Sequence, residues 1–460
     1  MSNNFSESQL IKVWQNQLLD RTELVTEDGE RIEIIYPGRL NDEQGADFRD
    51  AVIATSKGLL KGDIEIHVKS SDWKNHCHHQ NPAYNRVILH VAMWNNTGTN
   101  TKLQNGTEVP ILALNKHTEI TDNQCPSPTS CLITSRVPCL NIVQRLNGQT
   151  ITELLARFGE ERFFNKVSRF RGDLNKTEAN QSLYQGIMEA LGYSKNKLPF
   201  FELARRLPIH ILESIGKRAT SDRECLIQHQ ALLLGIAGLL PTQYQKIYRR
   251  NGINDRWLEK LVQLWASLPY TKTMSFSDWN LFKVRPNNSP VRRLVAMSYL
   301  LLRYREKGLL PGLVHLIEDV PENGGYRNLE EGLQVTIDGY QTSHHNFYNS
   351  NRTGCLPLLG GSRAADIIVN VLLPFTFAWG QFSSQPELSN KAMDIYRLYP
   401  RLAVNSVEKH MSGQLGLSCG MVKLAKCQQG LIHIYKKMCT QGKCHKCDLS
   451  QLEAGNYIQV

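Results

Sequence analysis

The chain has 460 residues and an ordinary globular composition, with 41% hydrophobic and 21% charged residues. This length is sufficient for two or three domains with sizeable cores, and the composition excludes an intrinsically disordered protein. The net charge of +10 and the pI near 9.0 favour a polyanionic partner such as nucleic acid through long-range attraction.

Neither the N-terminus nor the apolar segments indicate secretion or membrane insertion. The first ten residues lack a basic region followed by an apolar one, so we expect no signal peptide. The most apolar window, residues 364–379, contains Asp366, Asn370 and Pro374 and is too short to span a bilayer. We therefore expect a cytoplasmic protein without membrane contact, whose eleven cysteines are thiols or metal ligands rather than disulfides.

The first 120 residues have the pattern of an α/β domain. Residues 9–19 carry apolar side chains at helical spacing, and Asp28-Gly29 favours a tight turn between two strands. Strands are expected at residues 24–26, 31–36, 47–54, 59–69, 87–94 and 109–114. A helix, several strands, one crossover and further strands are typical of a mixed sheet with flanking helices.

One strand, within the sequence GDIEIHVKSSDW at residues 62–73, has a polar face suited to catalysis. Asp63, Glu65, His67 and Lys69 share this face, and side chains two residues apart are roughly 6–7 Å from each other. Pairing with the preceding strand through a turn near residues 56–58 would bring Asp47 beside Glu65. Two carboxylates can hold Mg²⁺ and a substrate phosphate, and the metal and a lysine favour hydroxide over water. The pattern predicts a Mg²⁺-dependent phosphodiesterase; a strand pair with solvated charges is the alternative.

Several segments also carry a family resemblance. GADF (45–48), EIHVKSSDW (65–73), HHQNPAYNRVILHV (78–91) and RPNNSP (285–290) resemble an uncharacterised bacterial family of unknown function over nearly the whole chain. Its N-terminal part is similar to the PD-(D/E)XK nuclease superfamily, whose core is a helix, a meander of strands, a helix and a further strand.

This resemblance implies roles for particular residues. Asp47 and Glu65 would be the two metal-binding acids of a nuclease that hydrolyses nucleic-acid phosphodiesters. His67 stands where the motif has its lysine, so Lys69, one pleat further along, or His67 itself would activate the water. The departure leaves open a non-catalytic nucleic-acid-binding protein on a degenerate nuclease fold, and hydrolysis of another phosphate ester also remains open.

The crossover after this strand contains His76, Cys77, His78 and His79, which are residue types that bind zinc. No second cysteine lies two to four residues from Cys77, and adjacent histidines point in different directions on a regular backbone. We therefore expect solvated histidines beside an anionic-substrate site rather than a zinc site.

Residues 121–150 contain scattered prolines and little periodicity, which indicates a linker, whereas residues 151–460 have the pattern of a compact helical domain. Within this domain, KVRPNNSPVRR at residues 283–293 has four cations and no acid. Arg285, Arg292 and Arg293 lie near an expected helix start and are predicted to bind nucleic-acid phosphates. Packing of these arginines within the protein is the alternative.

Three cysteines near the C-terminus have the spacing of metal ligands. Cys439, Cys444 and Cys447 lie within nine residues, among lysines whose charges lower thiol pKa values. The spacing predicts a structural metal site, either zinc or an iron–sulfur cluster. The resemblance allows a cluster, because several nucleases of the superfamily carry one on terminal cysteines. The candidates for the fourth ligand are His445, Cys355, Cys419 and the cysteines at residues 125–139.

Overall fold

The computed structural model describes residues 5–17, 19, 24–117, 139–243, 256–270, 272–281, 284–321, 326–336, 357–418 and 420–451. The chain divides into two compact units. Unit 1 comprises Met1–Gly159, Val404–Lys423 and Cys427–Val460, and unit 2 comprises Glu160–Ala403 and Leu424–Lys426. The C-terminal segment therefore belongs with the N-terminal sheet, whereas the sequence pattern had grouped it with the helical domain. Most of the expected linker lies outside the described residues.

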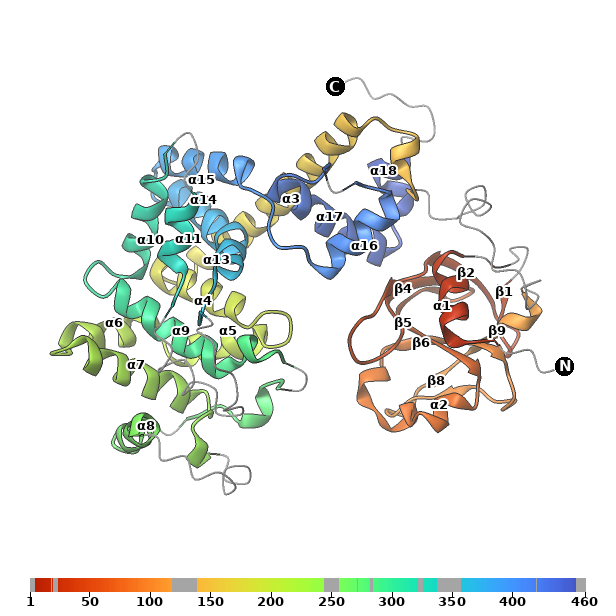
Figure 1. The fold of residues 1–460 in the computed structure, drawn as a ribbon, viewed down its shortest axis with the longest axis horizontal. Coiled ribbons are helices and arrows are strands. Elements are labelled where there is room, and N and C mark those ends of the chain that lie inside the picture. The colour runs from red at the N-terminus through yellow and green to blue at the C-terminus, as the bar shows by residue number, and fades with distance from the viewer. Residues whose placement is uncertain are drawn as a thin grey trace. The chain divides into compact units, whose positions relative to one another are not determined.

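Unit 1 is built on a seven-stranded mixed sheet (Figure 1). Its strands are β1 (Leu24–Val25), β2 (Arg31–Tyr36), β3 (Arg39–Leu40), β4 (Phe48–Thr55), β5 (Gly58–Lys69), β6 (Val87–Trp94) and β9 (Ile111–Ala113). The order is β1-β2-β4-β5-β6-β9, with β3 paired to β4. Strands β2, β4 and β5 form an antiparallel meander, and β6 and β9 continue parallel to β5. The predicted mixed sheet is confirmed.

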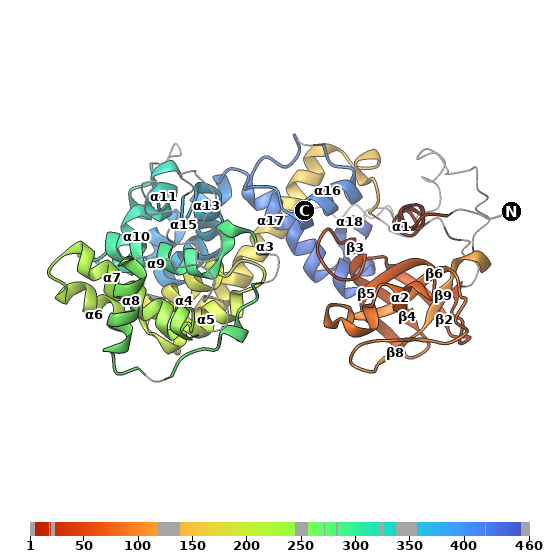
Figure 2. The same cartoon turned by 60° about the horizontal axis from the view of Figure 1, so that its bottom comes forward.

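Both faces of this sheet are covered. Helix α1 (Glu7–Gln15) begins with a capping box on Ser6 and packs Leu10 and Trp14 against Ile64 and Ile66 of β5 in one buried cluster. The opposite face carries α2 (Asp72–Asn75), η1 (His78–Gln80), η2 (Pro82–Tyr84) and the hairpin of β7 (Thr101–Lys102) and β8 (Glu108–Val109). In Figure 2, α1 and β8 lie on opposite sides of the strands. The polar face of β5 is therefore buried.

The remaining part of unit 1 is helical and packs on the sheet. It contains η4 (Ile142–Gln144), the start of α3 (Gly148–Leu174), α16 (Ser406–Leu415), α17 (Ala425–Lys437), η10 (Cys439–Gln441), η11 (Cys444–Lys446) and α18 (Asp448–Gln451). Tyr36 and Val52 of the sheet share a buried cluster with these helices. The Tyr36 hydroxyl lies 2.6 Å from His410 Nε2, and the Tyr435 hydroxyl donates to Asp50 Oδ2 at 2.8 Å.

Unit 2 is helical and has one large buried core. Its helices include α4 (Ala179–Leu191), α5 (Lys197–Arg206), α6 (Ile209–Arg218), α7 (Asp222–Ile236), α8 (Arg256–Ala266), α9 (Pro290–Arg303), α10 (Leu309–Glu318), α11 (Tyr326–Leu333), α13 (Gly361–Ile367), α14 (Leu373–Phe382) and α15 (Pro386–Leu398). Two helical stretches, Asp222–Gln243 and Gly361–Phe382, are long and apolar enough to cross a membrane, but their most apolar windows are 72% and 67% buried. That burial is consistent with core helices of a soluble protein.

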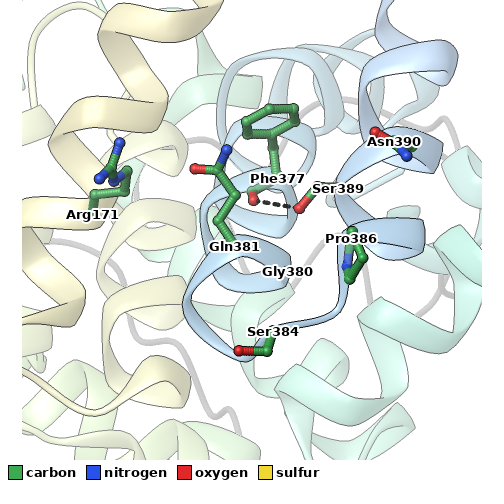
Figure 3. Close-up of a pocket in the computed structure, with 8 residues that line it drawn as sticks. All are labelled: Arg171, Phe377, Gly380, Gln381, Ser384, Pro386, Ser389 and Asn390. Carbon is green, nitrogen blue, oxygen red and sulfur yellow. Dashed lines mark hydrogen bonds between the residues drawn. The ribbon is translucent and has the colours of Figure 1, made fainter.

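Unit 2 also contains a pocket of about 450 Å³ (Figure 3). It is lined by Arg171, Phe377, Gly380, Gln381, Ser384, Pro386, Ser389 and Asn390. The Ser389 hydroxyl donates to the Phe377 carbonyl at 3.0 Å, which closes one wall. Because the lining has no carboxylate, histidine or cysteine, this pocket offers neither metal ligands nor a catalytic base.

Candidate functional site

Strand pairing brings the two predicted acids together. Phe48 of β4 pairs with Ile64 of β5, so the residue before β4 lies beside Glu65. The Asp47 N–H donates to Glu65 Oε2 at 3.1 Å, and the Ile66 N–H donates to Asp47 Oδ2 at 2.9 Å. These backbone bonds fix both carboxyl groups relative to the sheet.

The surroundings of this pair oppose negative charge. Glu65 is only 5% exposed, and burial raises its pKa to about 8. Burial also raises the pKa of Asp47 to about 7, and the neighbouring charge of Glu65 adds to this effect. The buried Glu65 and the half-buried Asp47 will therefore both be fully ionised at neutral pH only if a cation binds near them.

A chain of hydrogen bonds orients His67 on the same face of β5. His67 Nδ1 lies 2.9 Å from His90 Nε2, and His90 Nδ1 lies 2.7 Å from Thr101 Oγ1. The parallel pairing of β5 with β6 sets this contact, since Glu65 is opposite His90. Burial and then the adjacent His90 lower the pKa of His67 well below its usual value, so the ring is neutral.

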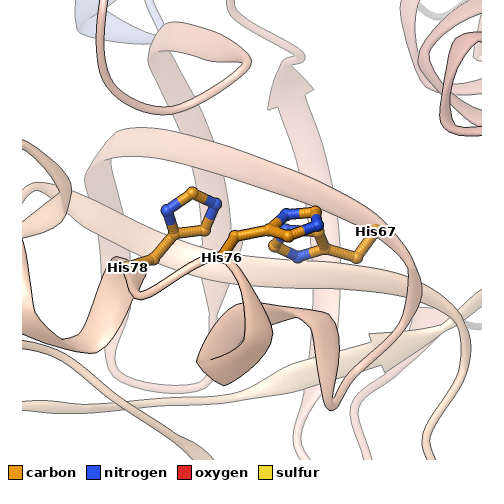
Figure 4. A group of neighbouring side chains, drawn as sticks. All are labelled: His67, His76 and His78. Carbon is orange, nitrogen blue, oxygen red and sulfur yellow. The ribbon is translucent and has the colours of Figure 1, made fainter.

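Two histidines of the crossover join His67. The ligand atoms of His67, His76 and His78 all lie within 4.8 Å of one another (Figure 4). Cys77, between the two crossover histidines, has a left-handed backbone with φ of 59°, and this local break lets both rings approach the strand. The sequence analysis expected solvated histidines here; the structure instead places His76 and His78 beside His67, while the adjacent His79 is not part of the group.

Glu65 links the imidazoles to the acids. Its Oε1 atom lies 3.0 Å from His78 Nε2 and 3.6 Å from His67 Nε2. His78 in turn stacks on Tyr84 with 3.9 Å between ring centroids, which fixes the plane of the imidazole. The cluster therefore combines two carboxyl groups with three imidazoles, a residue set not recognised from the sequence beyond Asp47, Glu65 and His67.

One ring nitrogen of this cluster has no hydrogen-bond partner. His67 Nε2 is buried, and among the described residues no donor or acceptor satisfies it. A buried polar atom without a partner costs roughly 1–3 kcal/mol, so such atoms call for an explanation. A metal ion would accept the lone pair of this nitrogen and would favour the ionised forms of Asp47 and Glu65, so the residues present fit a divalent cation.

Lys69 is not part of this cluster. Its side chain is exposed near the end of β5, and its backbone N–H donates to Asp72 Oδ2 at 3.1 Å. Among the described residues, no ion pair joins its ammonium group to Asp47 or Glu65. Lys69 therefore lies apart from the carboxyl and imidazole groups that the fold brings together.

The three predicted phosphate-binding arginines do not share one surface. Arg292 and Arg293 are 2% and 6% exposed, whereas Arg285 is exposed. The Arg293 guanidinium donates to the Leu358 carbonyl at 2.8 Å and to Asn288 Oδ1 at 2.9 Å. In this geometry Arg293 holds α9 to the segment near Leu358, and only Arg285 faces solvent.

This difference gives a first testable prediction. Arg293→Ala should lower the free energy of unfolding by about 1–3 kcal/mol, because it leaves buried acceptors without a donor. Arg285→Ala, the matched control, should change it by less than about 0.5 kcal/mol. Urea denaturation measures both values. If nucleic acid binds, only Arg285→Ala should reduce the salt dependence, by a slope of ~0.9 on duplex or ~0.7 on a single strand. A loss of stability in Arg285→Ala only, or a reduced salt dependence in Arg293→Ala only, would contradict this interpretation.

The fold and the site together define a protein with a mixed-sheet domain that carries a partly buried carboxylate–imidazole cluster, followed by a mostly helical region. The chain belongs to the family described as protein of unknown function (DUF2851), whose model matches residues 7–402. This membership confirms the expected resemblance to a family of unknown function. No curated protein and no solved structure matches the chain.

Proposed function

We propose that this protein is a metal-dependent hydrolase of nucleic-acid phosphodiesters, with its centre at Asp47, Glu65, His67, His76 and His78. The observation that carries the proposal is the buried Nε2 atom of His67, which lies 3.6 Å from Glu65 Oε1 and has no hydrogen-bond partner among the described residues. A nitrogen so placed beside the Glu65 carboxyl group has the chemistry of a metal ligand.

The donor set favours particular metals. Mg²⁺ prefers oxygen ligands and retains several waters, and the two carboxylates alone could hold it. Imidazole nitrogens together with carboxylate oxygens suit Mn²⁺ or Zn²⁺ better than Mg²⁺. When bound, such an ion would lower the pKa of a water molecule and polarise a phosphoryl oxygen.

The side chains of the site would have different roles in binding the metal and moving protons. Asp47 and Glu65 would give up their protons when a cation binds, since the cation offsets the burial that raises their pKa values. His90 and Thr101 would hold the His67 ring in position through its Nδ1 atom. His76 is the exposed imidazole of the three, so it is best placed to accept a proton from the attacking water and pass it to solvent.

The order of elements supports a relationship to the PD-(D/E)XK nucleases. Helix α1, the meander β2-β4-β5, a short helical crossover and the parallel strand β6 follow the order of that core. Asp47 precedes the middle strand of the meander and Glu65 lies on the next, as the two acids of the superfamily motif do. The net charge of +10 supports a polyanionic substrate such as nucleic acid.

The departure of His67 from the superfamily's lysine favours a second candidate function. A protein that binds nucleic acid on this fold without cutting it would keep the basic charge and could use the metal for structure alone. This alternative differs from the first in one observable, which is product formation.

Cleavage assays on the purified full chain test the proposal. Plasmid DNA, single-stranded DNA, single-stranded RNA and a nitrophenyl phosphodiester are each incubated with Mn²⁺, Zn²⁺, Mg²⁺ or EDTA. We expect nucleic-acid cleavage that EDTA abolishes and that Mn²⁺ supports better than Mg²⁺. Binding without cleavage under every metal would favour the second function, and hydrolysis of the small diester alone would indicate another phosphate ester as substrate.

A further inference from the structure

A second group of possible metal-ligand residues lies in unit 1, and three of its members lie C-terminal to residues 7–402, the range that matches the family model. It begins with the loop after α17, which folds back tightly on itself. The Gly442 N–H donates to the Cys439 carbonyl at 3.1 Å, and the Cys447 N–H donates to the Cys444 carbonyl at 3.1 Å. Gly442 has φ of +66°, a conformation that glycine adopts without strain. These turns keep the three cysteines on one compact loop.

The thiols of this loop face the protein interior. Cys439 and Cys447 are 4% and 3% exposed and belong to the buried cluster that joins the C-terminal helices to the sheet, while Cys444 is half-buried. Free cysteines are often buried as small apolar residues, so burial alone does not indicate a ligand. The number of cysteines that come together at this place does indicate metal ligands.

Cys139 is the fourth cysteine, and it comes from a segment 300 residues earlier in the chain. It is 4% exposed and lies in the same buried cluster as Cys439 and Cys447. Helix α16 holds its segment in place, since Asn141 N–H donates to the Gln414 carbonyl at 2.9 Å and Gln414 Nε2 donates to Cys139 Sγ at 3.2 Å. Cys355, Cys419, Cys125 and Cys131, the other cysteines considered from the sequence, lie outside the described residues.

Cys139, Cys439 and Cys447 lie in one buried cluster, and neighbouring cysteines affect the pKa values of Cys139, Cys439 and Cys444. Burial raises the pKa of Cys139 to about 12, and the charges of Cys447 and Cys444 add to the shift. The pKa of Cys439 is raised in the same way, by burial and then by Cys139, Cys444 and Cys447. All four are free thiols among the described cysteines. A cation bound among these thiols would offset the burial and the neighbouring charges that disfavour the thiolate form of Cys139 and Cys439.

The spacing of the thiols distinguishes the kinds of metal centre. Four sulfurs around a single zinc ion, with Zn–S near 2.3 Å, are roughly 3.8 Å apart. In the described part of the chain, His67, His76 and His78 form the one group of three or more ligand residues whose atoms lie within 4.8 Å of one another, so these thiols are more widely spaced. A [4Fe–4S] cluster takes one thiolate on each of four irons and therefore needs the wider spacing.

We infer that Cys139, Cys439, Cys444 and Cys447 are the four ligands of a [4Fe–4S] cluster that joins the segment before α3 to the C-terminal end of the chain. The ligand set is distinct from the carboxylate–imidazole cluster, and the inference does not depend on hydrolytic activity. Its structural role follows from its position, since the four ligands come from the two ends of the helical part of unit 1.

The test uses the full chain, purified without oxygen or chelator from cells supplied with iron. We expect a brown protein with visible absorption and equal amounts of iron and acid-labile sulfide, about four of each per chain. Cys139→Ala should lose the absorption and most of the iron. Cys427→Ala, the matched control, should retain both, because Cys427 is 1% exposed in the same buried cluster but its thiol contacts the Thr152 carbonyl.

Three results would overturn the inference. One zinc ion per chain without iron would replace the cluster with a single-ion site. A protein without either metal would leave four ordinary thiols. Iron and absorption unchanged in Cys139→Ala would exclude Cys139 as a ligand. If Cys139→Ala does not fold, Cys444→Ala decides the assignment, because its half-buried thiol can be removed with less loss of packing, and it should lose the absorption as well.

Discussion

Glu65→Gln and Asp47→Asn should each lower metal-dependent cleavage by at least about 100-fold. Loss of a residue that merely supports a metal ligand costs about 10- to 100-fold in affinity or activity, so loss of a ligand should cost no less. Both substitutions keep the size of the side chain and an oxygen acceptor for the backbone N–H groups of Asp47 and Ile66. They remove the negative charge that the cation requires, and steady-state cleavage with Mn²⁺ measures the effect.

Asp63→Asn is the matched control for this experiment. Asp63 is a buried acid on the same face of β5, but its carboxylate accepts from the Asp50 N–H and lies 3.6 Å from the Arg86 guanidinium instead of facing the imidazoles. We expect it to retain cleavage within a few-fold of the unsubstituted protein. Full activity in both Glu65→Gln and Asp47→Asn would remove these acids from the reaction.

The metal-free protein should lose about 1–2 kcal/mol of unfolding free energy as the pH rises from 6.5 to 8. The folded-state pKa values of Asp47 and Glu65, about 7 and 8, are above their ordinary values. The stability that these groups contribute is therefore fully present at low pH and is lost as the pH rises through 7 and 8. This direction is opposite to that of a carboxylate in an ion pair.

The histidines of the site have the reverse effect at lower pH. Burial lowers the pKa of His90 to about 3 and that of His67 further, so their contribution is present above pH 6.5 and is lost as the pH falls. Above pH 6.5 these histidines no longer change the free energy of unfolding. The change in stability between pH 6.5 and 8 therefore reports on the carboxyl groups alone. Urea denaturation in EDTA measures the slope, and Glu65→Gln should reduce it.

Added Mn²⁺ should reverse this pH dependence, because its ligands must be deprotonated and its binding stabilises the folded state alone. A metal-free protein whose stability is constant or rises from pH 6.5 to 8 would contradict the raised carboxyl pKa values. A slope that Glu65→Gln leaves unchanged would assign the effect to other groups.

The features that the sequence predicted correctly are local ones. Alternation of apolar and polar residues predicted β4 and β5, and a turn of two residues between them was enough to bring Asp47 beside Glu65. The positions of His76 and His78 depend on the positive φ of Cys77, a residue type that gives no signal for such a conformation. The Cys-to-Cys spacing near the C-terminus was visible, but the approach of Cys139 depends on packing between distant segments.

Burial was predicted least well where a helix is covered on all sides. Arg292 and Arg293 are adjacent on α9, and one of two adjacent residues on a surface helix normally faces solvent. Here both are buried, together with Val291 and Leu294, so the positive charges are directed inward. The domain boundary also depends on packing between distant segments, since Leu431 and Ile434 of α17 lie in one buried cluster with Tyr36 and Val52 of the sheet.

Anomalous diffraction from crystals soaked in zinc will show whether the carboxylate–imidazole cluster binds a metal, because it locates the ion without requiring an assumed substrate. We expect a peak about 2.0–2.2 Å from Glu65 Oε1 and from ring nitrogens of His67 and His78, and this peak should be absent in crystals of Glu65→Gln. A diffraction map with no peak in this cluster, from crystals that bind zinc elsewhere, would contradict it.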